Sequence, residues 1–211
     1  MKKAVLISIR PEWCDLIVRG KKTIEVRKTR PKLETPFKVY IYCTKAPSKI
    51  GWPRIVPGKG WLRLDCTVIG EFVCARIDTI QRMGIDNNFD YCYLSLNEFG
   101  NDDIAIEITD IKKSCIRKAD LNKYGKNSSR LYAWHISDLK IYDKPKSLSG
   151  FSRHDFRGMN GTDVCGNESC EHYQPSGSYM LPPTCAINGC CLSKPPQSWC
   201  YVAEAEEDDA L

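Results

Sequence analysis

Hydrophobic and polar positions in the first 45 residues predict a strand, a short helix and two further strands. Residues 4–9 are an apolar run of strand length. A helix is expected over 11–19, because this segment opens on a proline and repeats apolar residues at helical spacing. Gly20 suits the left-handed turn that ends such a helix. The alternation in 23–28 and the apolar run 37–44 predict the next two strands.

The rest of the chain continues in short strands with few helices. The pattern predicts strands over 66–80, 131–142 and 193–202, a helix over 116–124, a loop over 45–62, and a hairpin or short helix inserted at 84–111. Because no strand–helix–strand spacing recurs, we expect a mainly β fold of the α+β class. It would be a small antiparallel β-barrel with two or more short helices and a cysteine-rich insertion. Residues 1–150 with 194–203 would form the barrel, 151–193 the insertion and 204–211 an acidic tail.

Composition indicates a globular protein with unevenly distributed charge. Of the 211 residues, 42% are hydrophobic and 27% charged, which excludes a disordered or collagen-like chain. No apolar run reaches the roughly 18 residues that span a bilayer. The first apolar run is too short for a signal peptide, so we expect a cytoplasmic protein without membrane contact.

The net charge of +5 conceals a basic part and acidic parts. Residues 1–50 hold 13 Lys/Arg against 4 Asp/Glu, whereas 84–111 hold seven acids and no base. The basic part is either a docking surface for phosphates or a solvated face without a partner. The acidic segments could contact a protein partner.

The segment 20–28 carries the most specific candidate chemistry. Lys22 follows the helix-ending glycine and precedes a strand on which Thr23, Glu25 and Arg27 share one face, about 7 Å apart. These side chains could line one pocket, and a desolvated Lys22 could act as a base. The alternative is a salt-bridged strand face open to water.

Six of the twelve cysteines are concentrated in residues 165–200. Without a secretory signal we expect a reducing compartment, where clustered cysteines suggest metal before disulfides. Two equally spaced pairs predict a structural zinc site with four thiolate ligands and no open position: Cys165 and Cys170, then Cys185 and Cys190. Disulfides or free thiols are the alternatives.

Aromatic residues and one histidine complete the candidate set. Tyr42, in a predicted strand, and Trp52, in a loop with several basic residues, could stack on nucleic-acid bases. His135 lies in the predicted strand 131–142. It is either a hydrogen-bonded structural residue or a base-reading or acid–base group of the cleft.

Four sequence blocks follow one another in a recognisable order: Ser8–Trp13 with Gly20–Arg27, Val39–Thr44, Gly70–Arg76, and Tyr132–Tyr142 with Lys194–Val202. Together they resemble the ASCH domain family of the PUA-like superfamily. The last block is similar to the long ASCH proteins of Firmicutes genomes and their phages. The resemblance implies a PUA-like β-barrel with a cleft beside the first helix, and binding of RNA or modified bases.

The resemblance also implies two kinds of enzyme. One bacterial group is similar to an acetylcytidine amidohydrolase, whose catalytic lysine is matched by Lys22 and whose strand threonine falls on Glu25 here. Some other ASCH proteins are reported as ribonucleases, in which Lys22 would serve as base or phosphate clamp.

Three hypotheses about function follow. The first is a module that binds RNA or a nucleotide-like small molecule in a basic cleft around Lys22, Glu25 and Arg27. Its further contacts would be Thr23, Tyr42, Trp52 and His135. The second is a hydrolase, either a ribonuclease or a modified-nucleoside amidohydrolase, with Lys22 and Glu25 as catalytic residues. The third is a phage-encoded adaptor that contacts a partner through its acidic segments. Structural zinc is the one cofactor expected.

Overall fold

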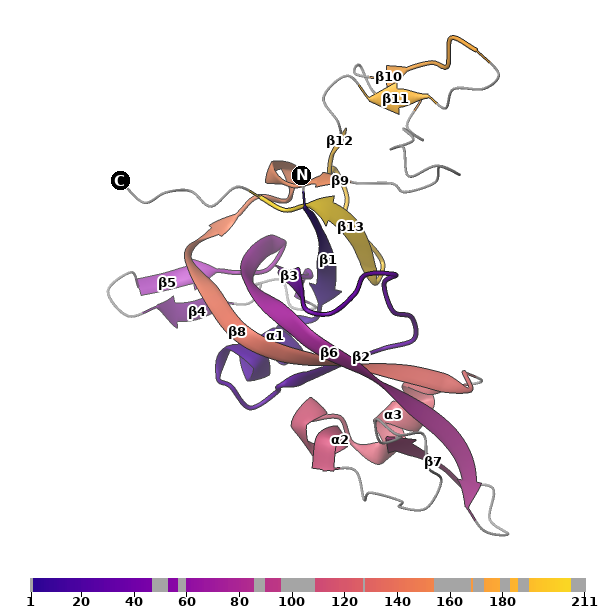
Figure 1. The fold of residues 1–211 in the computed structure, drawn as a ribbon. Coiled ribbons are helices and arrows are strands. Elements are labelled where there is room, and N and C mark those ends of the chain that lie inside the picture. The colour runs from indigo at the N-terminus through magenta and orange to yellow at the C-terminus, as the bar shows by residue number, and fades with distance from the viewer. Residues whose placement is uncertain are drawn as a thin grey trace. The chain divides into compact units, whose positions relative to one another are not determined.

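The computed structural model describes residues 2–46, 53–56, 60–85, 90–95, 109–126, 128–153, 168, 173–178, 183–185 and 190–205. The first elements are β1 (Lys3–Ile9), α1 (Pro11–Val18), β2 (Ile24–Arg27), β3 (Phe37–Cys43), β4 (Pro53–Val56), β5 (Gly60–Arg63), β6 (Thr67–Ile85) and β7 (Asp90–Ser95) (Figure 1). After them come α2 (Thr109–Ser114), α3 (Lys118–Gly125), β8 (Arg130–Lys146), the 3-10 turn η1 (Leu148–Gly150), β9 (Ser152–Arg153), β10 (Tyr173–Gln174), β11 (Thr184–Cys185), β12 (Cys190–Cys191) and β13 (Trp199–Ala203).

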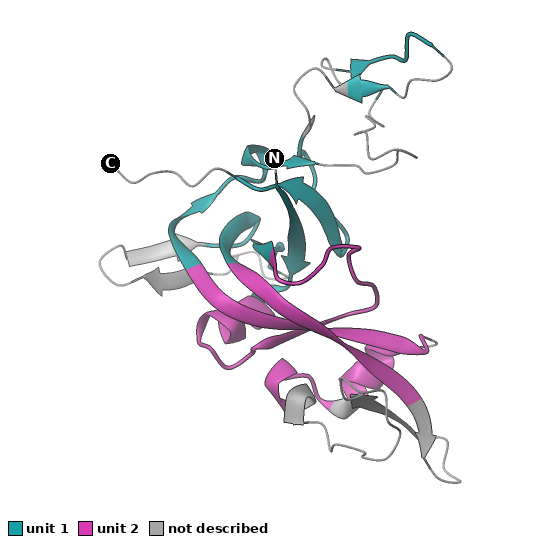
Figure 2. Ribbon diagram, viewed as in Figure 1, with its two compact units in different colours: residues 1–11, 38–71, 141–211 teal, residues 12–37, 72–140 magenta. Residues whose placement is uncertain are grey.

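One compact unit comprises residues 1–11, 38–71 and 141–211 (Figure 2). In this unit β1 pairs in parallel with β3 and antiparallel with β13. β1 is the apolar run of the sequence; every residue after Lys3 is buried, and the strand has a hydrogen-bonded neighbour on each side. The hydrophobic core of this unit contains Ala4, Leu6, Tyr40, Tyr42, Val68, Leu148, Phe151, Leu192 and Val202.

The second unit comprises residues 12–37 and 72–140, and it contains α1, β2, α2 and α3 (Figure 2). β2 pairs antiparallel with β8, so that Ile24 lies opposite His135 and Glu25 opposite Trp134. Alternation along β2 directs Ile24 and Val26 to one face, where they join a core with Ile80, Leu121, Leu131 and Ala133. Glu25 and Arg27 therefore lie on the other face.

The mainly β fold with a few short helices is confirmed, but the sheet is mixed and open. The pairing of β1 with β3 is parallel, because α1 and β2 form a crossover between them. The strand order is β12-β9-β13-β1-β3-β6-β8-β2, and within the described residues no pairing joins its two ends. A closed antiparallel barrel was thus too strong a prediction.

Two segment predictions were wrong in detail. The loop predicted at 45–62 contains all but the last residue of an antiparallel hairpin, in which Pro53 of β4 lies opposite Arg63 of β5. Proline is tolerated there because it is the first residue of its strand. The closing strand is shorter than the predicted 193–202, since the two prolines before β13 offer no backbone N–H. The division into a barrel, an insertion and a tail stays a prediction.

Residues 84–111 were expected to form a hairpin or a short helix, and the segment contributes a strand, as the hairpin alternative predicts. β7 pairs antiparallel with the far end of β6, with Met83 opposite Cys92. None of the helices in the described ranges has the length and hydropathy of a membrane span.

Candidate functional site

The turn that ends α1 places Lys22 inside the second unit. Gly20 has a φ of 68°, and its N–H donates to the Ile17 carbonyl at 2.9 Å. The N–H groups of Lys21 and Lys22 both donate to the Leu16 carbonyl, at 2.9 and 3.1 Å. This is the Schellman pattern of helix termination, which glycine supports because it enters the left-handed region without steric cost. The chain thereby turns sharply from α1 towards β2.

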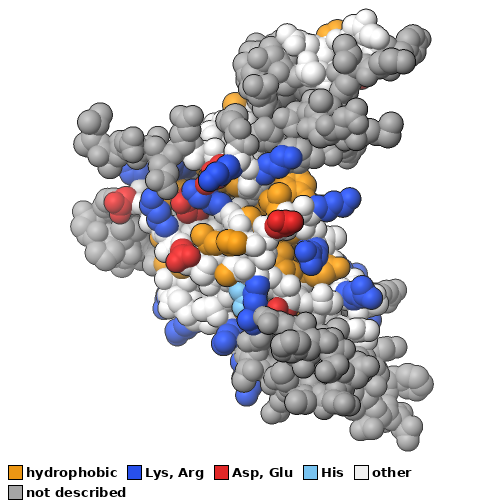
Figure 3. All heavy atoms as spheres, in the orientation of Figure 1, with side chains coloured by type: hydrophobic (Ala, Val, Ile, Leu, Met, Phe, Trp, Pro, Cys, Tyr) orange, Lys and Arg blue, Asp and Glu red, His pale blue; other side chains and the backbone are white. Residues whose placement is uncertain are grey.

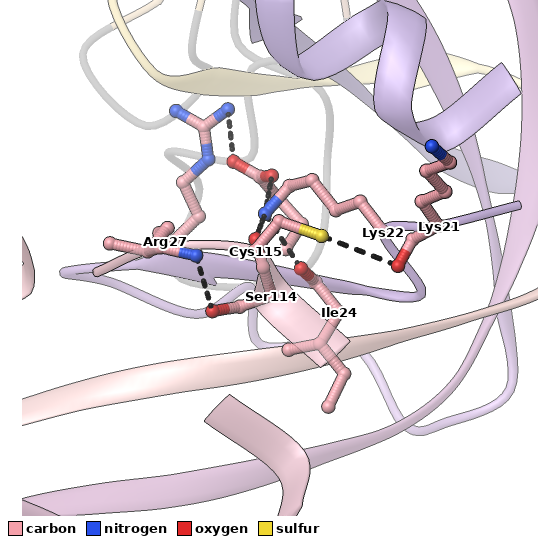
Figure 4. Close-up of polar contacts among 8 residues, drawn as sticks. Lys21, Lys22, Ile24, Arg27, Ser114 and Cys115 are labelled. Atoms are coloured by element: carbon pink, nitrogen blue, oxygen red, sulfur yellow. Dashed lines mark hydrogen bonds and ion pairs between the residues drawn. The ribbon is translucent and has the colours of Figure 1, made fainter. Parts of the chain in front are cut away.

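The ammonium of Lys22 is buried among three oxygen acceptors. Its Nζ donates to the Ile24 carbonyl at 2.8 Å and to the Ser114 carbonyl at 2.7 Å. The third neighbour is Glu25 Oε2 at 3.2 Å. Figure 4 shows the Lys22 side chain reaching back to its own strand and across to the end of α2. An ammonium has three N–H donors; the two carbonyls take two of them, while the contact with Glu25 is an ion pair.

The turn also satisfies the carbonyl groups at the C-terminal end of α2. The last carbonyls of a helix have no partner within it. Here Thr23 N–H donates to the Lys113 carbonyl at 3.0 Å, and Lys22 Nζ donates to Ser114. The Cys115 thiol points back to the Lys21 carbonyl at 3.3 Å (Figure 4). A buried cation also suits the negative end of the helix dipole.

Glu25 links the two cations of the predicted site. Its Oε1 lies 3.1 Å from Arg27 Nη2, while its Oε2 faces Lys22. The Glu25 side chain is 9% exposed and that of Arg27 11%. Although Oε2 is buried, it accepts no hydrogen bond of good geometry within the described structure. The result is a chain of three buried charges, the Lys22–Glu25–Arg27 ion chain, and not a strand face open to water.

His135 lies away from this ion chain, although both were assigned to one cleft. Since it pairs with Ile24, it is on the face of β2 and β8 opposite to Glu25. Its Nε2 lies 2.6 Å from Asp78 Oδ2, and Arg76 Nη2 lies 3.2 Å from the same oxygen. Burial acts to raise the pKa of Asp78, but His135 and Arg76 outweigh it and hold that pKa below its usual value.

Two other predicted contacts, Thr23 and Tyr42, have partners of their own outside the ion chain. Thr23 lies in the turn between Lys22 and β2, and its carbonyl accepts a hydrogen bond from the Ile136 N–H at 3.0 Å. Tyr42 belongs to the first unit and is buried in its core, where burial, reinforced by Cys66, raises the pKa of its hydroxyl to about 12.

Trp52 and most of the predicted zinc site lie beyond what the structure describes. Cys165 and Cys170 fall outside the described residues, as does Trp52. Only the backbone of Cys185 and Cys190 is described, in β11 and β12. The zinc site therefore stays a prediction.

Three residues near the ion chain were missed by sequence reasoning. Ser114 supplies a carbonyl, which no side-chain pattern reveals. Trp13 of α1 is half-buried, with Lys22 Nζ 5.2 Å from its ring centroid. Tyr124 of α3 has Lys28 Nζ 5.2 Å from its ring centroid. Burial raises the pKa of Tyr124, Arg27 opposes this rise and Glu25 adds to it, so the hydroxyl is within electrostatic reach of both.

These features define a mainly β protein with a mixed sheet and a buried ion chain at a helix-to-strand turn. The family model of the ASCH domain matches residues 7–83, a range that includes the whole ion chain. The resemblance to the ASCH family is therefore confirmed over this range. No curated protein matches the sequence.

Solved structures of an ASCH protein are similar to this chain. The crystal structure of ASCH from Zymomonas mobilis has 19% sequence identity and a TM-score of 0.44, covering 69% of this chain and 73% of that chain. A serine-to-alanine mutant of the same Zymomonas mobilis protein has 19% identity and a TM-score of 0.45, covering 69% and 74%.

Proposed function

We propose that this chain binds single-stranded RNA, or a nucleotide-like fragment of it, at the Lys22–Glu25–Arg27 ion chain. The observation that carries the proposal is Glu25 Oε2, a buried carboxylate oxygen that accepts no hydrogen bond within the described structure. Buried polar atoms are rarely left in this state by an ion chain that serves stability alone. A base N–H or a ribose hydroxyl is a donor that would complete it.

The charge around the site favours an anionic ligand. Lys21, Lys28 and Arg30 are exposed and lie close to the ion chain in sequence. Among the described residues on the face drawn in Figure 3, Lys and Arg side chains are more frequent than Asp and Glu. Cations at the rim would hold phosphates, while Glu25 and Arg27 would read the polar edge of a base. The match to the ASCH domain over residues 7–83 supports the same site.

A hydrolase at this site finds less support than binding does. For Lys22 to accept a proton, Nζ would have to give up one of its three oxygen neighbours, and two of these neighbours are buried carbonyls. In the present arrangement Lys22 acts as a cation whose ion pair positions Glu25. We therefore propose binding without turnover.

A titration of a fluorescein-labelled 12-nucleotide oligo(U), followed by anisotropy, tests the proposal. Arg27→Lys keeps a positive charge but loses the planar fork, and a hydrogen bond to a charged group contributes about 1.5–3 kcal/mol. The variant should bind about tenfold more weakly or worse. Arg153→Lys, the same substitution at an exposed arginine of β9, is the matched control and should bind like the wild type.

Two outcomes would contradict the proposal. If the wild type binds neither the oligonucleotide nor its mononucleotide at low salt, the ligand class is wrong. If RNA incubated for hours is cleaved, and Lys22→Met abolishes the cleavage while binding persists, the hydrolase hypothesis replaces the binding module.

A further inference from the structure

A second basic segment follows the acidic insertion and lies in the same unit as the ion chain. Residues 112–130 contain seven Lys/Arg and a single acid, Asp120. That acid is already engaged, because Arg117 Nε lies 2.7 Å from its Oδ2. The segment runs from the end of α2 through α3 to the start of β8. Its C-terminal half thus offers cations without a competing free carboxylate.

Tyr124 lies in this segment and is unusual in its exposure. Its side chain is the one large hydrophobic group that is exposed within the described part of the chain, at 38%. It occupies the last turn of α3, between the exposed Lys123 and Lys126. Lys28, which follows β2 directly, places its Nζ 5.2 Å from the ring centroid. An aromatic face with one cation over it and two exposed lysines close to it in sequence offers both a stacking surface and phosphate contacts.

The position of Tyr124 connects this segment to the ion chain. Lys28 is the residue after Arg27, so the cation over the ring and the guanidinium of the ion chain are adjacent in sequence. Arg27 and Glu25 also both affect the ionisation of the Tyr124 hydroxyl. A single strand whose base is read at Glu25 and Arg27 could therefore place a neighbouring nucleotide on Tyr124.

We propose that Tyr124 is a base-stacking platform for single-stranded RNA, with Lys28, Lys123 and Lys126 as its phosphate contacts. This inference rests on the proposed function and extends that site to a second nucleotide. A protein partner is less consistent with the segment, because stacking on one aromatic ring among cations suits a strand of alternating bases and phosphates. Lys28 is exposed and can leave the ring for a phosphate when a base takes its place.

Anisotropy titrations with the same oligo(U) test the platform. Tyr124→Phe keeps the ring and should bind within about twofold of the wild type, while Tyr124→Leu should bind about fivefold more weakly or worse. The double variant Lys123→Gln/Lys126→Gln should reduce the slope of log affinity against log salt by about 1.4, since each phosphate contact contributes about 0.7 on a single strand. Lys144→Gln/Lys194→Gln, at exposed lysines of the first unit, should leave the slope unchanged.

A measurement on the wild type covers the case in which Tyr124→Leu does not fold. Nitration of tyrosines by tetranitromethane, mapped by mass spectrometry, should fall at Tyr124 when oligo(U) saturates the protein. It should not change at Tyr201, a half-buried tyrosine of the first unit.

The outcomes separate this inference from the proposed function. If the wild type binds oligo(U) and Tyr124→Leu binds it equally well, the platform is wrong but the ion-chain site is unaffected. The same conclusion follows if saturating oligo(U) leaves the nitration of Tyr124 unchanged. Absence of any RNA binding by the wild type defeats the proposed function itself, and the platform with it.

Discussion

Replacing Lys22 tests whether the ion chain is also a structural joint between α1, β2 and α2. Lys22→Met keeps the aliphatic stem of a side chain that is only 1% exposed, and removes the charge. The variant leaves the Ile24 and Ser114 carbonyls without their donor, at sites where the native contacts measure 2.8 and 2.7 Å. It also removes one of the two cations that face the buried Glu25 carboxylate, the one at 3.2 Å, and leaves Arg27 as its partner.

The expected loss is a large part of the stability of a domain. Removing one partner of a buried ion pair costs about 3–5 kcal/mol. Two hydrogen bonds from a charged donor, at about 1.5–3 kcal/mol each, give a similar sum. Against a typical free energy of unfolding of about 5–15 kcal/mol, the variant should remain folded only marginally.

Urea denaturation followed by circular dichroism measures this loss, with Lys21→Met as the matched control. Lys21 is exposed, and its substitution should change the free energy of unfolding by less than about 0.5 kcal/mol. The double variant Lys22→Met/Glu25→Gln should recover no stability, because Glu25 in Lys22→Met is still paired with Arg27 at 3.1 Å and its removal leaves that buried guanidinium without its anion. Hydrogen exchange should accelerate most in α2. A loss below about 1 kcal/mol for Lys22→Met would refute the structural role.

Two further predictions concern the turn and the other face of β2. Gly20→Ala should destabilise the fold by about 1–2 kcal/mol, because alanine is strained at a φ of 68° although no atom obstructs its Cβ; an unchanged melting temperature would contradict this. Asp78→Asn should lower stability at neutral pH. Because the folded-state pKa of Asp78 lies below its usual value, the carboxylate contributes above that usual value of about 3.9, and the contribution is lost as pH falls through the folded-state pKa. The wild type and Asp78→Asn should therefore differ above about pH 4 and converge below it, and a constant difference from pH 2 to 6 would contradict this reasoning.

The local elements and the membership of the ion chain could be predicted because they depend on short-range patterns. Gly20 ends α1 as expected, since the Schellman turn is encoded within a few residues. The alternation in β2 correctly separated Glu25 and Arg27 from Ile24 and Val26. Burial of these charges could not be read from the sequence, because it depends on α2, which lies about 90 residues further along the chain.

Long-range placement accounts for most of what was missed. His135 shares a strand pair with the site but not its face, and only the register of β2 against β8 decides that. Tyr42 occurs in a strand of alternating aromatic and apolar residues, where a buried core position and a binding position look alike. The exposure of Tyr124 follows from how α3 packs, and its neighbouring lysines were the one sequence signal for it.

Nuclear magnetic resonance on the isotope-labelled chain, titrated with oligo(U), tests most directly whether the ion chain is the binding site. The largest shifts are expected at the backbone amides of residues 20–28 and at the Arg27 side-chain Nε–H, with smaller ones around Tyr124. Shifts confined to the first unit, or spread evenly over exposed lysines while residues 20–28 stay unchanged, would contradict the assignment.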